Sequence, residues 1–332
     1  MDVTDTLRLD ICEQSQISDA RRRIVNFSID CGLDQEARDR LALVVTELGT
    51  NLVKHSQNGG RILAQGMVNA NGSAIEVFSV DRGPGMNVGQ CMLDGFSTTE
   101  TFGNGLGSAK RNSNDFDVYS EIGKGSVIKV RFENKGSKLD KFEGGGISVP
   151  MPGELLSGDK WFIASLPEGC ACLLVDGLGH GFEASEAATL ARKRFKENLN
   201  LPPKELLKVI HTSLRGTRGA VGAIAKIDFA KGKLTYCGLG NITGLLFFND
   251  TKKYLTSFNG TLGYEARKFL EVEVDWNADS MLIMCSDGIS STTFRELGEA
   301  SHRSASLLAA WIYSNYGKST DDATVLILKG RV

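Results

Sequence analysis

Two short stretches decide how this chain is interpreted: Glu47-Leu-Gly-Thr-Asn51 and Asp176-Gly-Leu-Gly-His-Gly181. The first places a carboxylate and an amide at positions i and i+4 of an expected helix, so both side chains project from one face. The second places a carboxylate beside glycines at the end of an apolar run. The first pattern is suited to ATP held on magnesium, and the second to a metal-bound water that removes phosphate.

Length and composition limit the class of protein. The chain has 332 residues, which indicates two domains at about 100–200 residues each. Its hydrophobic content of 41% and charged content of 23% are typical of a soluble globular protein. The net charge of −2 argues against a nucleic-acid or anionic-membrane partner. No apolar run reaches the roughly 18 residues of a membrane span. The acidic start Met1-Asp-Val-Thr-Asp5 is unlike a signal peptide, and the seven scattered cysteines fit reduced thiols, so we expect a cytoplasmic protein.

The N-terminal part alternates between helical and strand-like patterns. A helix is expected over Ile17–Ile29 with Ser18 as its cap, and a longer helix from its cap Asp34 to about His55. A further helix begins near Gly105, and residues 134–146 have no periodicity and are expected to form a linker. The expected strands are Ile62–Val68 and Ala74–Val80, joined by the hairpin signal Asn71-Gly72, followed by Phe116–Ser120 and Val127–Phe132.

Beyond the linker, strands dominate and three helical stretches interrupt them, which predicts packed sheets with helices outside. The helices are expected over Glu183–Asn198, Lys204–Leu214 and Ala305–Tyr316. The strands are expected over Trp161–Ala164, Ala171–Val175, Ala220–Ile227, Lys233–Gly238, Leu245–Phe248, Leu270–Val274, Met281–Cys285 and Thr324–Leu328.

Glu47 and Asn51 are candidates for catalysis and for magnesium binding. A carboxylate at position 47 can orient or deprotonate a hydroxyl, and an amide oxygen one turn later can bind the ion. Alone, the pair is better explained as solvated polar residues of an amphipathic helix. The two glycine motifs that follow favour the nucleotide interpretation.

The first glycine motif, Asp81-Arg-Gly-Pro-Gly-Met86, follows directly after an expected strand. Its carboxylate can accept a hydrogen bond from an exocyclic amine, and its glycines let the chain pass close to a ring. The second, Gly103-Asn-Gly-Leu-Gly107, opens a helix, whose free N–H groups and dipole favour phosphates. One such cluster indicates only a turn, whereas all three motifs in this order indicate a nucleotide site.

These motifs resemble the N, G1 and G2 boxes of the GHKL ATPase/kinase superfamily. Gly107-Ser-Ala-Lys-Arg111 and Ser120-Glu-Ile-Gly-Lys-Gly125 are similar in particular to RsbT-type serine/threonine kinases of bacterial partner-switching systems. The resemblance covers residues 1–134 and implies a two-layer α/β sandwich of the Bergerat type, with ATP and Mg²⁺ under a lid at about Asn87–Phe102. It assigns Glu47 as base, Asn51 as magnesium ligand, Asp81 as adenine-binding residue, Gly83 and Gly85 to the base pocket, and Gly103, Gly105 and Gly107 to the phosphate loop. A histidine kinase is disfavoured because no histidine precedes His55, which lies inside the N-box helix.

Four acidic positions stand out after the linker, each at the end of an apolar strand. Two divalent cations held by shared carboxylates can lower the pKa of a bridging water and bind a phosphoryl group. Any single acidic-glycine pair is better explained as a turn, but four are not. The positions are Asp159, Asp176, Asp287 and the doublet Asp321-Asp322.

Residues 147–330 resemble the metal-dependent protein phosphatases (PPM, protein phosphatase 2C-like), specifically the SpoIIE/RsbX branch. Arg218-Gly-Ala-Val-Gly-Ala-Ile224 and Leu234-Thr-Tyr-Cys-Gly-Leu-Gly-Asn241 contribute to this resemblance as whole strands. It implies a four-layer α-β-β-α sandwich with two Mn²⁺ or Mg²⁺ ions at one edge. Asp176 would bridge the metals with help from the Gly177 carbonyl, and Asp159, Asp287 and Asp321 would complete the site. Either Asp321 or Asp322 of the doublet could bind the metal, and position within the motif favours Asp321.

Together these features predict an α/β (α+β) chain with a kinase domain at 1–134, a linker at 135–146 and a phosphatase domain at 147–332. By resemblance, the substrate is a serine or threonine on a STAS-domain antagonist or scaffold protein, phosphorylated by one domain and dephosphorylated by the other. Two alternatives remain: a phosphatase whose ATP domain only senses nucleotide or docks a partner, and a non-catalytic anti-sigma-type binding protein. The sequence does not specify the oligomeric state.

Overall fold

The computed structural model describes residues 2–69, 72–92, 105–134, 143–248, 251–290 and 297–330. Its residues divide into two compact units. The N-terminal unit is formed from Asp2–Lys138 together with Leu297–Asn315, and the C-terminal unit from Leu139–Glu296 and Tyr316–Val332. Each unit is therefore assembled from two separate stretches of the chain.

The N-terminal unit is built on one antiparallel sheet of six strands with the order β1-β3-β4-β6-β5, in which β2 also pairs with β3. The β3–β4 ladder closes at the pair Asn69↔Gly72, as the hairpin signal predicts. The strands β1 and β2 were not expected from the sequence. The strands are β1 (Asp2–Val3), β2 (Leu7–Ile11), β3 (Gly60–Asn69), β4 (Gly72–Asp81), β5 (Asp115–Glu121) and β6 (Gly125–Glu133).

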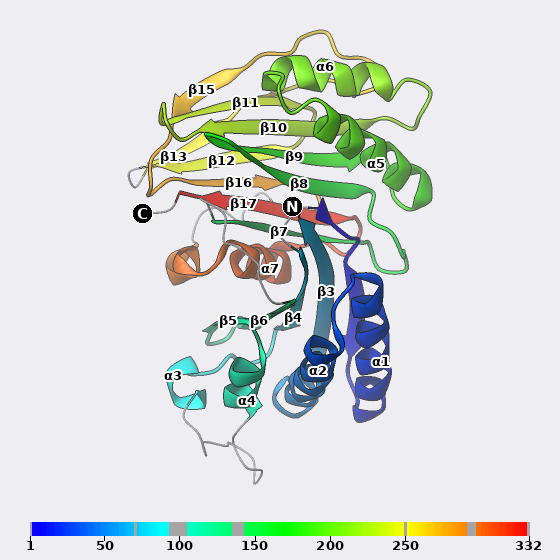
Figure 1. Cartoon of the computed structure of the whole chain (residues 1–332), viewed down its shortest axis with the longest axis vertical. Helices are drawn as coiled ribbons and strands as arrows, with labels where there is room; N and C mark the ends of the chain where they lie inside the picture. The colour runs from blue at the N-terminus through cyan, green and yellow to red at the C-terminus, as the bar shows by residue number, and fades with distance from the viewer. Residues whose placement is uncertain are drawn as a thin grey trace. The chain divides into compact units, whose positions relative to one another are not determined.

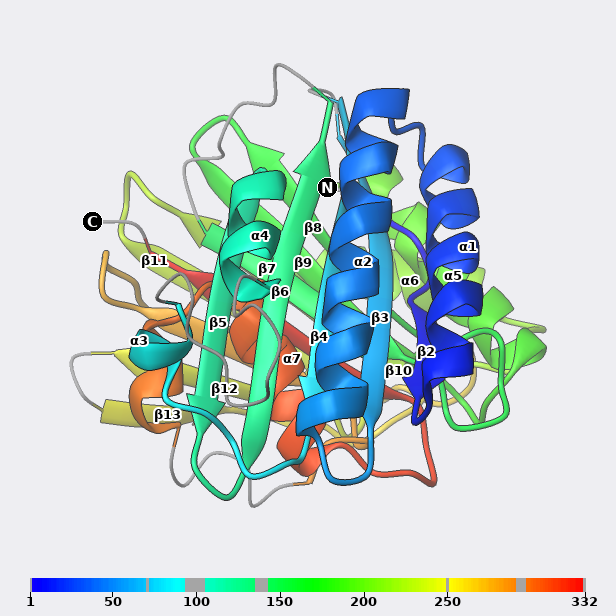
Figure 2. The same ribbon diagram turned by 90° about the horizontal axis from the view of Figure 1, so that it is seen from below.

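Helices cover one face of this sheet, as Figure 2 shows for α1, α2 and α4. Their apolar residues recur every three to four positions and pack on Ile75, Val77 and the other inward-facing strand residues. Asp34 caps α2 as expected, because its carboxylate accepts a 2.8 Å hydrogen bond from the Ala37 amide. The helices are α1 (Gln14–Asp30), α2 (Gln35–His55), α3 (Val88–Cys91) and α4 (Gly105–Asn112).

The start of α1 differs from the sequence prediction. The helix begins four residues before the expected cap Ser18, because Glu13 and Gln16 form a reciprocal capping box. Ser18 therefore lies inside the helix. Ser18 could cap a helix, but the Glu13–Gln16 pair caps this one earlier, because it satisfies two backbone groups at once.

The C-terminal unit contains two antiparallel-rich sheets that pack face to face (Figure 1). The Sγ of Cys172 in one sheet lies 3.7 Å from the Sδ of Met284 in the other, inside their shared core. One sheet has the order β14-β11-β10-β9-β8 with β15 paired to β11, and the other has the order β13-β12-β16-β17-β7. The strands are β7 (Glu143–Val149), β8 (Asp159–Leu166), β9 (Gly169–Gly177), β10 (Ala220–Asp228), β11 (Lys233–Leu239), β12 (Thr243–Phe248), β13 (Thr251–Leu255), β14 (Ser257–Phe258), β15 (Val272–Asp275), β16 (Met281–Cys285) and β17 (Ala323–Lys329).

Helices α5 (Phe182–Glu197) and α6 (Pro203–Ser213) cover the outer face of the first sheet (Figure 1). Alanines of α5 and leucines of α6 pack on Leu173, Val175 and Ile224. Helix, sheet and sheet thus account for three of the four layers expected here. The helix expected for the fourth, α7 (Ala305–Tyr316), is grouped by its contacts with the N-terminal unit up to Asn315.

One further expectation needs correction. Residues 143–146, placed in the linker, begin β7, which pairs with β17 from Glu143↔Lys329 to Val149↔Ala323. The sequence did not predict this strand, because three consecutive glycines are unfavourable in a strand. Glycine is tolerated here where the neighbouring sheet approaches closely. None of the helices in the described part of the chain is long and apolar enough to cross a membrane.

Candidate functional site

The structure brings the acidic positions of the C-terminal unit to one edge of the sandwich. Asp159 begins β8 and faces Asp176 directly across the β8–β9 ladder. Paired residues of an antiparallel ladder point to the same side of the sheet, so these two carboxylates share one face. Asp287 follows β16 and Asp321 precedes β17, and these two strands are neighbours in the second sheet.

Burial and the neighbouring carboxylates raise the pKa values of the acidic groups at this edge. Burial raises the pKa of Asp159 to about 7, and the charges of Asp322 and Asp321 add to this shift. Burial likewise raises the pKa of Asp176 to about 10, with further increases from Asp159 and Asp287. The pKa of Asp321 is raised by burial and then by Asp287. Such mutual repulsion is relieved when a divalent cation is bound.

The donor set fits hard divalent cations. Asp159 is buried, and its Oδ2 has no hydrogen-bond partner. A buried carboxylate oxygen without a partner is costly, and a cation would satisfy it. In the described part of the chain, however, no three acidic, histidine or cysteine side chains already form a closed ligand set. The structure therefore shows a convergent group of carboxylates rather than an assembled metal centre.

Glycines allow this edge to be built. Gly177 ends β9, and a Cβ atom there would lie 2.2 Å from the main-chain oxygen of Ala184 in α5. The amide of Gly177 donates to the carbonyl of Gly158, 3.1 Å away. The loop after β9 is therefore held between the start of β8 and helix α5.

The doublet divides its roles between its two residues. Asp322 is buried, and its oxygens accept 2.7 Å hydrogen bonds from the amides of Met151 and Gly158. Asp322 therefore fixes the loop that leads into Asp159. Asp321 is half-exposed beside Asp287, which favours Asp321 as the ligand.

Two contributions at this edge were missed in the sequence. Asn241 donates from Nδ2 to Asp287 Oδ2 at 2.6 Å, and Lys318 donates from Nζ to the Asp287 carbonyl at 2.5 Å. Asn241 belonged to a quoted motif, but its role depends on a loop 46 residues away. His180 pairs with Glu154 at 2.8 Å, in keeping with a structural role for this histidine.

The nucleotide motifs of the N-terminal unit also converge. Glu47 and Asn51 are half-buried on α2 and face the first turn of α4. A Cβ atom on Gly105 would lie 3.3 Å from Glu47 Oε2 and 3.6 Å from the Asn51 amide group. Gly107 lies two residues further into α4, and Gly103 and residues 93–102 of the expected lid lie outside the described residues.

Asp81 ends β4 and lies beside the C-terminal end of α2. Its Oδ1 accepts a 2.7 Å hydrogen bond from the Gly83 amide, while burial raises the pKa of its carboxyl. A Cβ atom on Gly83 would lie 3.3 Å from the Cα of Ser56, just past α2. Gly85 has a φ of 75°, and a Cβ atom there would lie 2.4 Å from the Glu121 carbonyl oxygen. Glycine is therefore required at position 85, and the close packing favours it at position 83.

Comparison with known proteins defines the class of the C-terminal half. Residues 167–331 match the family model described as Stage II sporulation protein E (SpoIIE). The chain is 24% identical over 144 residues to the phosphoserine phosphatase RsbX of Bacillus subtilis (strain 168), covering 43% of this chain and 72% of RsbX. Residues 167–331 therefore resemble SpoIIE-type domains, and the chain is similar in sequence to a phosphoserine phosphatase.

The N-terminal part resembles a kinase, over a shorter stretch of sequence. It is 27% identical over 112 residues to the serine/threonine-protein kinase RsbT of Bacillus subtilis (strain 168), covering 33% of this chain and 84% of RsbT. This is a similarity of sequence over one third of the chain.

Solved structures agree on the fold of the phosphatase domain. A chain described under "The bacterial stressosome: a modular system that has been adapted to control secondary messenger signaling" superposes with a TM-score of 0.55 at 26% identity, covering 57% of this chain and all 100% of that one. RsbX in complex with magnesium superposes with a TM-score of 0.52 at 19% identity, covering 58% of this chain and 97% of RsbX. The second match shows the fold alone.

Proposed function

We propose that this chain is a bifunctional regulator that phosphorylates and dephosphorylates serine or threonine on a partner protein. The observation that carries the proposal is the convergence of two separate sets of groups in one chain. Asp159 faces Asp176 in the SpoIIE-type domain, while Glu47 and Asn51 face the glycine turn that opens α4. The two sets suit opposite directions of phosphoryl chemistry.

In the phosphatase domain, Asp159, Asp176, Asp287, Asp321 and the Gly177 carbonyl would hold two Mn²⁺ or Mg²⁺ ions. RsbX, which shares this fold, has been solved with magnesium. Two such ions supply an activated water and bind the phosphoryl oxygens. Asn241 orients Asp287, and Asp322 holds the loop of Asp159, so the chain fixes the carboxylates before substrate arrives.

In the N-terminal unit, we assign a two-layer GHKL fold with an ATP–Mg²⁺ site. Glu47 would accept the proton of the attacking hydroxyl, and Asn51 would bind magnesium. Asp81, Gly83 and Gly85 would hold the adenine, and Gly103, Gly105 and Gly107 the phosphates. The N-terminus of α4 supports this, because its free N–H groups favour phosphate oxygens.

The partner is proposed to be a STAS-domain antagonist or scaffold protein. One relative of the chain is a phosphoserine phosphatase and another is a serine/threonine kinase, and one similar solved structure is described under a title on the bacterial stressosome. We therefore place this chain in a partner-switching pathway.

The test follows ³²P from ATP onto a purified STAS-domain protein and then its release on adding Mn²⁺. Glu47→Ala should abolish the arrival of label, and Asp287→Ala should abolish its departure. Each variant is the control for the other, because the residues lie in different units. Normal arrival of label with Glu47→Ala would overturn the kinase assignment.

A phosphatase whose N-terminal unit only senses nucleotide is the second candidate, and the weaker likeness to RsbT favours keeping it. It predicts ATP binding without any transfer of label. An anti-sigma-type binding protein without activity predicts no hydrolysis of an aryl phosphate with Mn²⁺.

A further inference from the structure

The face of the N-terminal sheet that points away from α1, α2 and α4 buries charged side chains among apolar ones. On β6, Ile128, Val130 and Phe132 pack under the helices, so the alternating residue Lys129 points to the other face. Lys129 and Glu76 are only 3% and 4% exposed. A sheet face that buries opposite charges needs partners of matching geometry.

Segment 303–314 supplies these partners within the same unit. Glu76 accepts hydrogen bonds from Gln65 Nε2 at 3.1 Å and from Ser306 Oγ at 3.0 Å. Lys129 donates from Nζ to Ser304 Oγ at 3.1 Å and forms an ion pair with Asp115 at 2.7 Å. Buried charged groups with specific partners favour one register of packing, because a shifted register would leave those charges unsatisfied.

The N-terminal end of α7 is capped by the sheet. Asp117 of β5 accepts a 2.9 Å hydrogen bond from the Ser304 amide, and its charge complements the helix dipole. Tyr119 and Trp311 pack edge to face, with ring centroids 4.8 Å apart. The helix is thus attached to β5 along its length as well as at its start.

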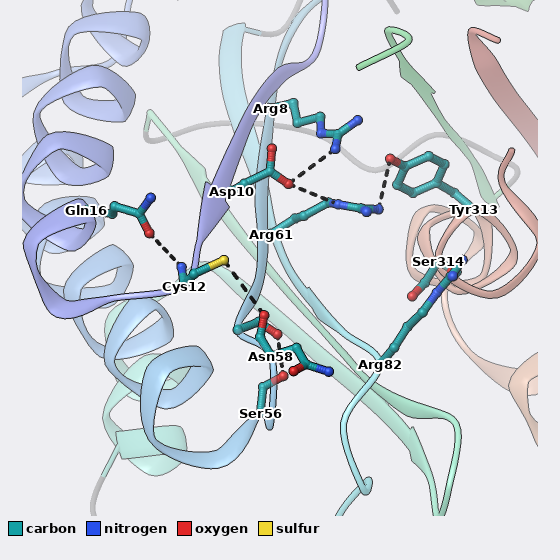
Figure 3. Close-up of polar contacts among 11 residues, drawn as sticks. Arg8, Asp10, Cys12, Gln16, Ser56, Asn58, Arg61, Arg82, Tyr313 and Ser314 are labelled. Carbon is teal, nitrogen blue, oxygen red and sulfur yellow. Dashed lines mark hydrogen bonds and ion pairs between the residues drawn. The ribbon is translucent and has the colours of Figure 1, made fainter. Parts of the chain in front are cut away.

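The C-terminal end of α7 is attached beside the first glycine motif (Figure 3). Arg82 donates from Nε to the Ser314 carbonyl at 2.5 Å, and Arg61 donates from Nη1 to the Tyr313 hydroxyl at 3.4 Å. Arg82 is the immediate neighbour of Asp81, the residue proposed to bind adenine. A cation at the last carbonyls of a helix is favourable on both hydrogen-bonding and dipole grounds.

The residues at and just after the end of α7 hydrogen-bond to the segment that follows Asp287. The Tyr316 carbonyl accepts a 2.9 Å hydrogen bond from the Ser290 amide, and the Lys318 amide donates to Gly288 at 2.8 Å. These bonds lie within the C-terminal unit. Ser314, which is bonded to Arg82, is therefore two residues from a position that holds the Asp287 loop.

We propose that α7 couples the two active sites: nucleotide bound at Asp81 alters the Arg82–Ser314 bond and, through α7, the Asp287 loop of the phosphatase. The proposal rests on the proposed function, because both sites must bind their ligands. Binding linkage is reciprocal, so metal in the phosphatase site must change nucleotide affinity by the same factor. The coupling element is the C-terminal end of α7, whose hydrogen bond from Arg82 to Ser314 is either formed or broken.

The test uses the full-length protein with a non-hydrolysable ATP analogue. Hydrogen–deuterium exchange of residues 305–316 and Mn²⁺-dependent hydrolysis of an aryl phosphate are measured with and without the analogue. We expect the analogue to change both the exchange rate of α7 and the hydrolysis rate by about fivefold or more, a typical size for allosteric coupling. Arg82→Gln should reduce both effects to less than twofold while the analogue still protects α2.

Arg131→Gln is the matched control. Arg131 lies on the same strand as Lys129 and pairs with Glu133 of its own strand at 3.0 Å, so this variant should keep the full response. Protection of α2 by the analogue with no change in α7 exchange or hydrolysis in the wild type would overturn the coupling and leave the proposed function standing. No protection of α2 in the wild type would instead overturn nucleotide binding itself. A response that Arg82→Gln retains in full would also overturn the proposal.

Discussion

Asp159 and Asp176 are directly paired across the β8–β9 ladder, so two carboxylates that each disfavour ionisation share one face of the sheet. An antiparallel pair of like charges is destabilising unless something neutralises it. The site therefore stores repulsion that divalent cations would relieve, and several predictions test it.

Asp176→Asn should stabilise the metal-free protein and abolish phosphatase activity, because the substitution removes a buried carboxyl whose ionisation folding disfavours and a proposed metal ligand. In a chelator at pH 8 we expect the melting temperature to rise by about 2–4 °C, equivalent to about 1 kcal/mol. Asp228→Asn is the control in the same sheet. Asp228 pairs with Lys231 at 2.8 Å on the surface. Loss of this carboxylate should leave the phosphatase activity intact and should not raise the melting temperature. A lower melting temperature for Asp176→Asn would contradict the claim that the Asp176 carboxyl destabilises the metal-free protein.

Metal-free stability should fall as pH rises. The pKa of Asp159 is raised from 3.8 to about 7 and that of Asp176 from 3.8 to about 10, so folding favours the protonated forms. Their contribution is complete below pH 3.8 and is lost as pH rises through about 7 for Asp159 and about 10 for Asp176. Melting curves in chelator between pH 5 and 9, set against Asp159→Asn, measure this slope. The variant should show a shallower fall, and an unchanged slope would contradict the assignment.

Asn241→Ala should weaken metal binding without unfolding the domain, because the Asn241 amide orients Asp287 from outside the ligand set. Loss of such a supporting group typically lowers metal affinity about 10–100-fold. Calorimetric titration with Mn²⁺ measures the affinity. Asn198→Ala removes a comparable amide that bonds the Arg194 carbonyl, and it should bind Mn²⁺ normally. Equal affinities in the two variants would remove Asn241 from the site.

Gly177→Ala should disrupt the phosphatase site while leaving phosphoryl transfer intact. The added Cβ would lie 2.2 Å from the Ala184 carbonyl oxygen, so β9 and α5 would have to separate. Gly216→Ala is the control, because it adds a methyl group at a φ of 83° with open space around it. We expect that control to cost about 1 kcal/mol and to keep its hydrolysis. Normal hydrolysis by Gly177→Ala would show that the edge tolerates the shift.

Gly105→Ala should reduce nucleotide binding without loss of stability. Alanine is favoured over glycine in a helix by about 1 kcal/mol, but its Cβ would lie 3.3 Å from Glu47 Oε2. We expect transfer of label from ATP to fall at least about tenfold, with an equal or higher melting temperature. Gly72→Ala, in the β3–β4 hairpin, adds a Cβ with open space around it and should transfer label normally. Undiminished transfer by Gly105→Ala would place the phosphates elsewhere.

The sequence predicted most of the elements because their signals are local. The cap Asp34, the period of the apolar residues in α2 and the Asn71-Gly72 hairpin each depend on neighbours a few residues away. Strand β16 and helix α7 have the bounds that were expected for them. The order of the three nucleotide motifs and the four acidic strand ends likewise pointed to the candidate site residues without any tertiary information.

The sequence failed where a partner from a distant part of the chain decides the outcome. The glycines 144–146 form a strand because β17, far along the chain, pairs with them. The sequence favoured Asp321 over Asp322 as the ligand, but it did not show that the amides of Met151 and Gly158 donate to both Asp322 oxygens. Asn241 joins the site through Asp287, and neither residue indicates the other in sequence.

By itself, the sequence determined which residue types carry the chemistry and which local elements present them. Only the tertiary structure decided that α7, encoded between Asp287 and Asp321, packs on the sheet that ends at Asp81. Its largely apolar composition is typical of a buried helix, and all residues from Ala305 to Ser314 are buried. Burial alone does not specify which surface α7 packs on, because hydrophobic packing is non-directional. The hydrogen bonds of Glu76 with Ser306 and of Lys129 with Ser304 select the sheet as its partner.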